Sequence, residues 1–268
     1  MRDAGLQQAI RAVGGISSLA RALGVSQPAI SGWSRIPAER VSAVESVSGV
    51  PRQVLRPDLY PSDNEGAAVD VLDPVDAARG QLYLLFANLL LRIPDEDVLI
   101  DLRRLSGDET SFGQALDALA ASADITQAEA IAREHFSLFV GVGRGELLPF
   151  ASYYLTGFLY ERPLVRARSD MRRLGVERSA EFSEPEDHIG FLMEIMAGLV
   201  LRRIAGEASE EKKFFEKHLK PWAERFFADL AKAESAKFYQ AVGRLGAVFM
   251  AIESEAFEMA GSETSDAA

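Results

Sequence analysis

The chain of 268 residues contains no cysteine and only three histidines. Without thiols there is no disulfide framework, no thiolate metal ligand and no cysteine nucleophile. His135, His188 and His218 lie far apart, and none has a second histidine at the i+3 or i+4 spacing of a metal-binding helix, so zinc, haem and iron–sulfur centres are not expected. A Gly-x-Ser-x-Gly elbow is also missing. The sequence therefore predicts a protein without metal or other cofactor that is not an enzyme.

Long apolar runs are absent as well. The best candidate, residues 82–91, is about half as long as a helix that spans a bilayer. The first residues lack the apolar core and the cleavage site of a signal peptide. Hydrophobic residues make up 48% of the chain, which is enough for a sizeable core. We therefore expect a cytoplasmic protein with no membrane insertion.

Charge is distributed unevenly along the chain. Residues 1–60 hold seven arginines and no lysine against four acidic residues, a net charge of +3. The remaining residues hold 22 basic and 36 acidic side chains, a net charge of −14. A basic head is able to approach phosphates, and an acidic body favours cationic partners. The alternative interpretation is that the acidic surface only promotes solubility.

Apolar residues recur at helical spacing throughout, and no segment shows the alternation of a strand, so the fold class is all-α. We expect a small domain over residues 1–60, a polar linker over 61–72, a helical domain over 73–260 and a flexible tail over 261–268. Asp73 followed by Pro74 starts a helix, and Thr126 and Glu129 form a predicted capping box. Further helices are expected at residues 163–174, 185–204, 212–232 and 236–257.

The first domain carries a helix-turn-helix pattern in residues 19–33. Gly24 suits the tight turn between the two helices, and Ser26 is expected to cap the second one. This arrangement leaves Gln27, Pro28 and Ser31 on the outward face, where a recognition helix meets base edges. Arg35 is placed to hold a phosphate just beyond the helix.

Residues 10–60 resemble a helix-turn-helix of the Cro/YdaS type, through the pattern GGxxxLAxxLGVSxxAISxW. The resemblance implies DNA binding through Gln27, Pro28, Ser31 and Arg35, and a homodimer for two half-sites. Such modules also serve as protein–protein contacts, and the modest charge of +3 leaves both roles open.

The glycine-rich residues 141–145 superficially suggest a nucleotide loop. They follow a predicted helix rather than a strand, and they lack the Lys-Ser/Thr pair of a phosphate loop. The sequence therefore favours a flexible connector.

Residues 184–194 read EPEDHIGFLME. Pro185 suits the first turn of a helix, and Glu186 and Asp187 complement its positive N-terminal end. Spacing alone indicates an ordinary helix start with His188 as a capping or core-edge residue, and a binding role is the alternative.

Residues 184–196 are also similar to the ExPxDH signature of the TorD/DmsD/NarJ redox-enzyme maturation chaperones. Residues 135–141 resemble the family's Y-x-x-LF-x-G block, with His135 in place of tyrosine. Residues 147–155 resemble its P-x-x-S-x-Y block, and residues 166–175 its helix ending in Y-x-x-x-G, with Met171 in place of an aromatic residue. These blocks occur in the family's order and cover roughly residues 73–257.

The resemblance implies a chaperone that binds the twin-arginine leader, or another N-terminal segment, of a molybdoenzyme precursor. Formate dehydrogenase and the DMSO- or TMAO-reductase-like enzymes are examples of such clients. The chaperone would assist cofactor insertion and delay export. The alternative is a DNA-binding regulator that uses the TorD-like domain as a sensor. The implied peptide-binding residues are Glu184, Pro185, Asp187, His188, Pro149, Tyr153 and Tyr154. Carboxylates would attract the arginines of a leader, and aromatic walls would hold its apolar stretch.

Overall fold

A computed structural model describes residues 3–13, 15–60, 72–178, 183–206 and 208–265. Over these residues the protein is helical, with one isolated bridge and no strand, which confirms the all-α fold class. The chain divides into two compact units, Met1–Val71 and Leu72–Ala268. Most of the predicted linker, residues 61–71, lies outside the described residues.

The first unit consists of short helices around a small core. They are α1 (Ala4–Ala12), α2 (Ile16–Ala22), α3 (Gln27–Ser31), the 3-10 helix η1 (Ala38–Arg40), α4 (Val41–Ser48) and α5 (Arg52–Leu55). Leu19 and Ile30 bury their side chains where α2 packs against α3. Gly24 has a φ of 64° in the turn between them, a backbone conformation that glycine adopts without steric cost. This is the helix-turn-helix that the sequence predicts.

The second unit, which we call the body, contains longer helices. They are α6 (Pro74–Leu91), α7 (Glu96–Leu102), α8 (Ser111–Ile125), α9 (Ala128–His135), the π-helix η2 (Phe136–Val140), α10 (Ala151–Thr156), α11 (Arg162–Arg173), α12 (Ile189–Val200), α13 (Ala208–His218), α14 (Ala223–Leu230) and α15 (Phe238–Ser265). Asp73 caps α6 by accepting a hydrogen bond from Val75 N at 2.7 Å, as its sequence predicts.

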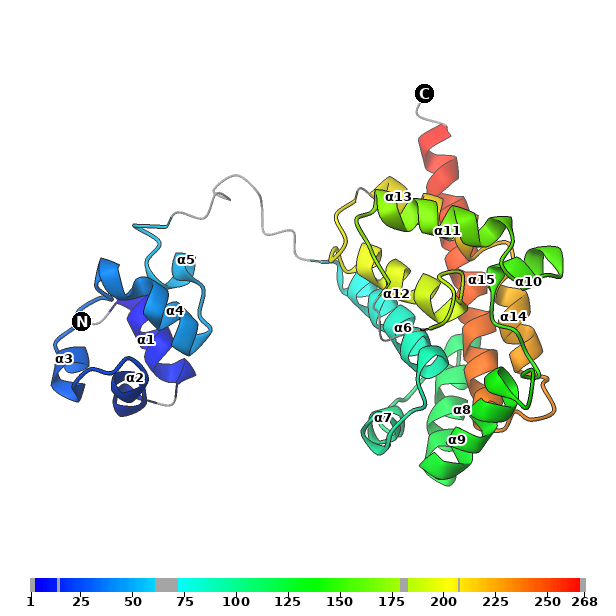
Figure 1. Ribbon diagram of the computed structural model, residues 1–268, viewed down its shortest axis with the longest axis horizontal. Helices are drawn as coiled ribbons and strands as arrows, with labels where there is room; N and C mark the ends of the chain where they lie inside the picture. The colour runs from blue at the N-terminus through cyan, green and yellow to red at the C-terminus, as the bar shows by residue number, and fades with distance from the viewer. Residues whose placement is uncertain (1–2, 14, 61–71, 179–182, 207, 266–268) are drawn as a thin grey trace. The chain divides into compact units, whose positions relative to one another are not determined.

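Two helix pairings organise the body (Figure 1). Helix α12 packs along α6, and the long α15 packs against α14 and α8. Every residue of α12 except Glu194 is buried, so this helix runs through the core. Helix α11 lies over the same end of the body and packs against α10 and α13.

Two buried acidic side chains hold these helices in place. Glu134 at the end of α9 accepts hydrogen bonds from the backbone nitrogens of Lys237, Phe238 and Tyr239, at 2.7–3.1 Å, and so caps α15. Glu253 of α15 pairs with Arg79 of α6 at 2.7 Å and accepts from the hydroxyl of Tyr83. Each buried charge thus has the partners that make its burial tolerable.

Some predicted helix boundaries are wrong. Thr126 does not form a capping box, because its hydroxyl donates to Ser122 O at 2.7 Å and Gln127 takes the N-cap position of α9. The helix predicted over residues 212–232 is interrupted, because Pro221 has no amide hydrogen to continue the ladder after α13.

Both ends of other predicted helices also differ. The helix predicted over 185–204 spans only Ile189–Val200, for a reason given below. At the C-terminus α15 continues to Ser265, further than the end near residue 257 that the periodicity predicts. Of the expected flexible tail, residues 266–268 lie outside the described part of the chain.

Candidate functional site

The segment before α12 forms a turn instead of a first helical turn. His188 N donates to Pro185 O at 3.0 Å, and α12 begins at Ile189. Ile189 N in turn donates to Pro149 O at 2.8 Å, and Phe150 and His188 form the isolated antiparallel bridge. Residues 185–189 are thus fastened to residues 149–152, the segment that leads into α10.

Asp187 makes the strongest of these connections. Its side chain is 1% exposed, and Oδ2 accepts a hydrogen bond from Ser152 N at 2.8 Å. Its backbone carbonyl accepts from Ala151 N at 3.0 Å. A carboxylate that receives backbone amides at the start of a helix acts as a cap and complements the helix dipole. Asp187 therefore caps α10, the helix opposite its own, and this is why the chain cannot be helical from Pro185.

His188 caps its own helix. Its ring is 4% exposed, and Nδ1 accepts a hydrogen bond from Gly190 N at 3.0 Å. The ring also packs edge-on against Phe150, with 5.2 Å between centroids. Burial, and to a lesser degree the charge of His135, lowers the pKa of His188 to about 3. The imidazole is therefore neutral near pH 7, as its role as an acceptor at Nδ1 requires.

The two tyrosines point to other partners. Tyr153 accepts a hydrogen bond from Arg144 Nη2 at 3.2 Å, and this guanidinium lies 5.5 Å from its ring centroid. Tyr154 packs on Trp222 and donates to Asp229 Oδ2 at 3.1 Å. The 141–145 connector and α14, rather than Asp187 and His188, are the neighbours of these side chains.

Of the seven predicted peptide-binding residues, the structure brings four together. Pro149 and His188 are buried at the junction with Asp187, and Pro185 is half-buried beside them. Glu184 is exposed at its edge. The buried members build the junction, so a peptide would meet its outer surface and not these side chains.

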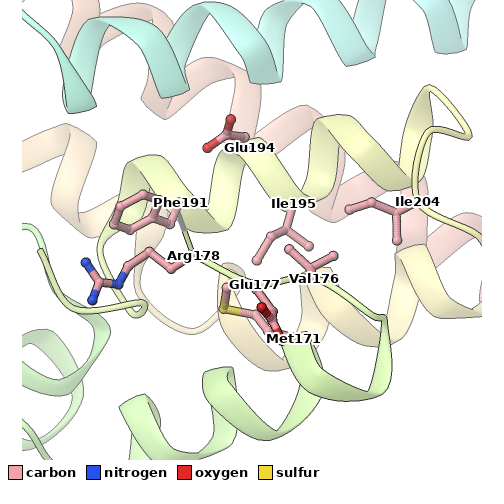
Figure 2. A pocket seen from close by; sticks show the side chains of 8 residues that line it. All are labelled: Met171, Val176, Glu177, Arg178, Phe191, Glu194, Ile195 and Ile204. Atoms are coloured by element: carbon pink, nitrogen blue, oxygen red, sulfur yellow. The ribbon is translucent and has the colours of Figure 1, made fainter. Parts of the chain in front are cut away.

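A hollow of about 240 Å³ lies next to this junction, between α11 and α12 (Figure 2). Met171 of α11 and Phe191 and Ile195 of α12 line it. Val176, Ile204, Glu177, Arg178 and Glu194 complete the lining. Sequence reasoning did not identify this site. A usable signal was present, however: Glu194 is the one charged residue in the apolar sequence IGFLMEIMAGLV.

A second hollow shares four of these residues and is more polar. It adds Arg168, Arg172 and Glu186 to the lining. Glu186 is engaged by two guanidinium groups, with Arg168 Nε at 2.8 Å and Arg178 Nε at 3.8 Å. The positive charges of this neighbouring hollow are therefore partly neutralised.

Within the described residues, no group of three His, Asp or Glu side chains is arranged to hold a metal ion. None of the helices in that part of the chain has the length and apolarity needed to cross a bilayer.

On the helix-turn-helix, all four predicted DNA-binding residues, Gln27, Pro28, Ser31 and Arg35, are exposed. Arg35 forms an ion pair with Asp58 at 3.2 Å. Exposed pairs of this kind contribute about 0–1 kcal/mol, so a phosphate could compete for the guanidinium.

Two family models match the chain. The model described as nitrate reductase delta subunit matches residues 106–228, and the model described as bacterial toxin YdaS matches residues 6–64. The chaperone protein TorD of Shewanella pealeana is 25% identical over 195 residues, which cover 65% of this chain and 87% of the relative. TorD of Shewanella loihica is 24% identical over 207 residues, covering 68% and 94%.

The resemblance of the body to the TorD/DmsD/NarJ family is confirmed. A protein of Haemophilus influenzae assigned as the Tat proofreading chaperone DmsD is 29% identical over 117 residues, 43% of this chain and 56% of its own. These TorD-like relatives are named as chaperones and not as enzymes. A solved structure of a proposed redox enzyme maturation protein from Archaeoglobus fulgidus has 23% identity and covers 64% of this chain and 93% of its own. Its TM-score is 0.44, too low to establish a shared fold.

We predict that Asp187→Ala lowers the free energy of unfolding by about 2–3 kcal/mol, because a buried backbone amide of α10 loses its acceptor. Asp187→Asn keeps an acceptor oxygen and should cost less. Urea titrations followed by the fluorescence of Trp222, in a Trp33→Phe background, measure both changes. Asp124→Ala, at an exposed position of α8, is the control. An equal effect of Asp187→Ala and the control would contradict the capping role.

A second prediction concerns acid sensitivity. Because the pKa of folded His188 lies below the ordinary value of 6.5, the unfolded chain binds the proton first. Stability is complete above pH 6.5 and falls by up to about 1.4 kcal/mol per pH unit as the solution becomes more acidic. His188→Asn keeps an N-cap acceptor without the titrating ring, so its stability should fall less steeply in urea titrations at descending pH. Parallel pH profiles of the two proteins would refute this assignment.

Proposed function

We propose that the protein is a cytoplasmic chaperone for a molybdoenzyme precursor. It binds the twin-arginine leader or another N-terminal segment of that precursor, assists cofactor insertion and delays export. Clients of the formate dehydrogenase or DMSO/TMAO-reductase type fit this role. The observation that carries the proposal is the match to TorD chaperones along 87–94% of their length.

The physical properties of the body agree with this role. Its net charge of −14 attracts a cationic peptide and makes the association sensitive to salt. In this proposal, Glu184 and Pro185 contact the peptide at the outer surface of the junction, with Tyr153 and Tyr154 on the neighbouring α10. Pro149, Asp187 and His188 act from within, since they hold that surface in shape.

The proposal is tested with a synthetic twin-arginine leader of a molybdoenzyme, titrated into the intact chain by calorimetry. We expect a dissociation constant of about 1 μM or tighter, which weakens as salt is added. The control is the same leader with both arginines replaced by glutamine. If no twin-arginine leader binds better than its control, the chaperone proposal fails.

For the first unit we propose DNA binding, supported by the YdaS match and by the exposure of Gln27 and Ser31 at the start and end of α3. Because each chain carries one such unit, a homodimer would read two half-sites. Together with the body, this unit would form a regulator that senses the client.

The test of this second role is a Gln27→Ala/Ser31→Ala variant and a DNA sequence selected by the intact wild-type chain. We expect an affinity loss of about ten-fold or more, because both side chains would meet base edges. Gln8→Ala, at an exposed position of α1, serves as the matched control. If the double variant retains wild-type affinity, α3 is not a recognition helix. A change in DNA affinity on addition of the leader would support the sensor role.

A further inference from the structure

The hollow between α11 and α12 has the size and lining of a pocket for a single side chain. Its floor consists of the buried side chains Met171, Phe191 and Ile195. At about 240 Å³ it is smaller than the roughly 300–1,000 Å³ of sites for drug-sized ligands. Methionine is flexible and polarisable, so a floor that contains Met171 adapts to apolar groups of different shape. These properties suit one large apolar side chain better than a nucleotide or another cofactor.

The rim of the same hollow carries two unneutralised carboxylates. Glu177 and Glu194 are both exposed, and neither has an ion pair or side-chain hydrogen bond with the described residues. The third charged residue of the rim, Arg178, is already near Glu186 at 3.8 Å. The local excess of charge at the apolar hollow is therefore negative.

Glu194 is an unusual residue for its position. It is the one exposed residue of α12, whose other eleven residues are buried. Figure 2 shows that Phe191, Glu194 and Ile195 of this helix line the hollow with Met171. A carboxylate here has no described structural partner, in contrast to Glu134 and Glu253, which each support a helix. The core of the body does not account for Glu194, whereas a cationic ligand at the rim does.

We propose that this hollow is a recognition pocket for a peptide in which a large apolar residue lies next to arginine or lysine. The apolar side chain enters between Met171, Phe191 and Ile195. The neighbouring cation is held by Glu177 and Glu194. The pocket deepens the proposed chaperone function, on which it rests, because it defines the sequence chemistry that the body selects in its client. Charge complementarity favours such a peptide over a second copy of this chain, whose body is itself strongly acidic.

The first experiment uses charge reversal on the intact chain. Glu177→Lys and Glu194→Lys are titrated against a labelled synthetic peptide with an arginine pair followed by Phe-Leu, and binding is measured by fluorescence anisotropy. Each variant should weaken binding by about five-fold or more, because an attractive contact becomes repulsive. Glu109→Lys, an exposed position between α7 and α8 outside the hollow, has the same charge change and should bind like wild type.

The second experiment fills the hollow. Val176→Phe places a larger side chain at the half-buried rim and should weaken binding of the same peptide by about ten-fold or more. Val75→Phe, at an exposed position of α6, is the matched control, and thermal melting verifies that both variants remain folded. A peptide with Ala-Ala in place of Phe-Leu should bind wild type weakly and be insensitive to Val176→Phe.

The outcomes separate the pocket from the chaperone role. If a molybdoenzyme leader binds wild type and all pocket variants equally, the chaperone proposal stands and the pocket is wrong. If the leader fails to bind but the model peptide binds with the predicted variant effects, the pocket stands and the client is of another kind. If neither peptide binds, both proposals fail. If sedimentation shows that Val176→Phe or Glu194→Lys dissociates a wild-type dimer, the hollow is a subunit interface and the peptide pocket is refuted.

Discussion

The body depends on one junction, where Asp187 and His188 connect two segments that are distant in sequence. Asp187 caps α10 through Ser152 N, while His188 caps α12 through Gly190 N. Adjacent residues thus hold two helices by their N-termini. Neither side chain is tolerable in the interior without its partner, because a buried carboxylate needs hydrogen-bond donors and a buried imidazole must remain neutral. Their pairing also determines where α12 begins and how it enters the core along α6.

This junction changes the interpretation of the family signature in this chain. The residue types in ExPxDH suggest a charged rim for a cationic ligand, but two of them are inside the protein and already fully engaged. A residue that holds a surface in place is needed for binding even when it does not contact the ligand. In our interpretation the junction positions α12 against α11, and the exposed residues around the resulting hollow are those that meet a peptide.

The two units of the chain have opposite charge and separate cores. A unit of +3 with a helix-turn-helix and a body of −14 with a TorD-like sequence favour different partners. Joining them in one chain would couple the state of a client to the state of a second ligand only if the two units influence each other's binding. That coupling is a property of the intact chain and is measurable as a change in one affinity on addition of the other ligand.

The sequence by itself determined the helical class, the helix-turn-helix with its Gly24 turn, the start of α6 at Asp73 and the resemblance of the body to TorD-like chaperones. These features depend on local periodicity, on capping and on residues that are close along the chain. Only the tertiary structure decided that Asp187 serves α10, that Tyr153 and Tyr154 have other partners, and that Met171, Phe191 and Glu194 surround a hollow. Burial and cross-chain hydrogen bonds depend on which segments meet in space, and neither periodicity nor residue type specifies that meeting.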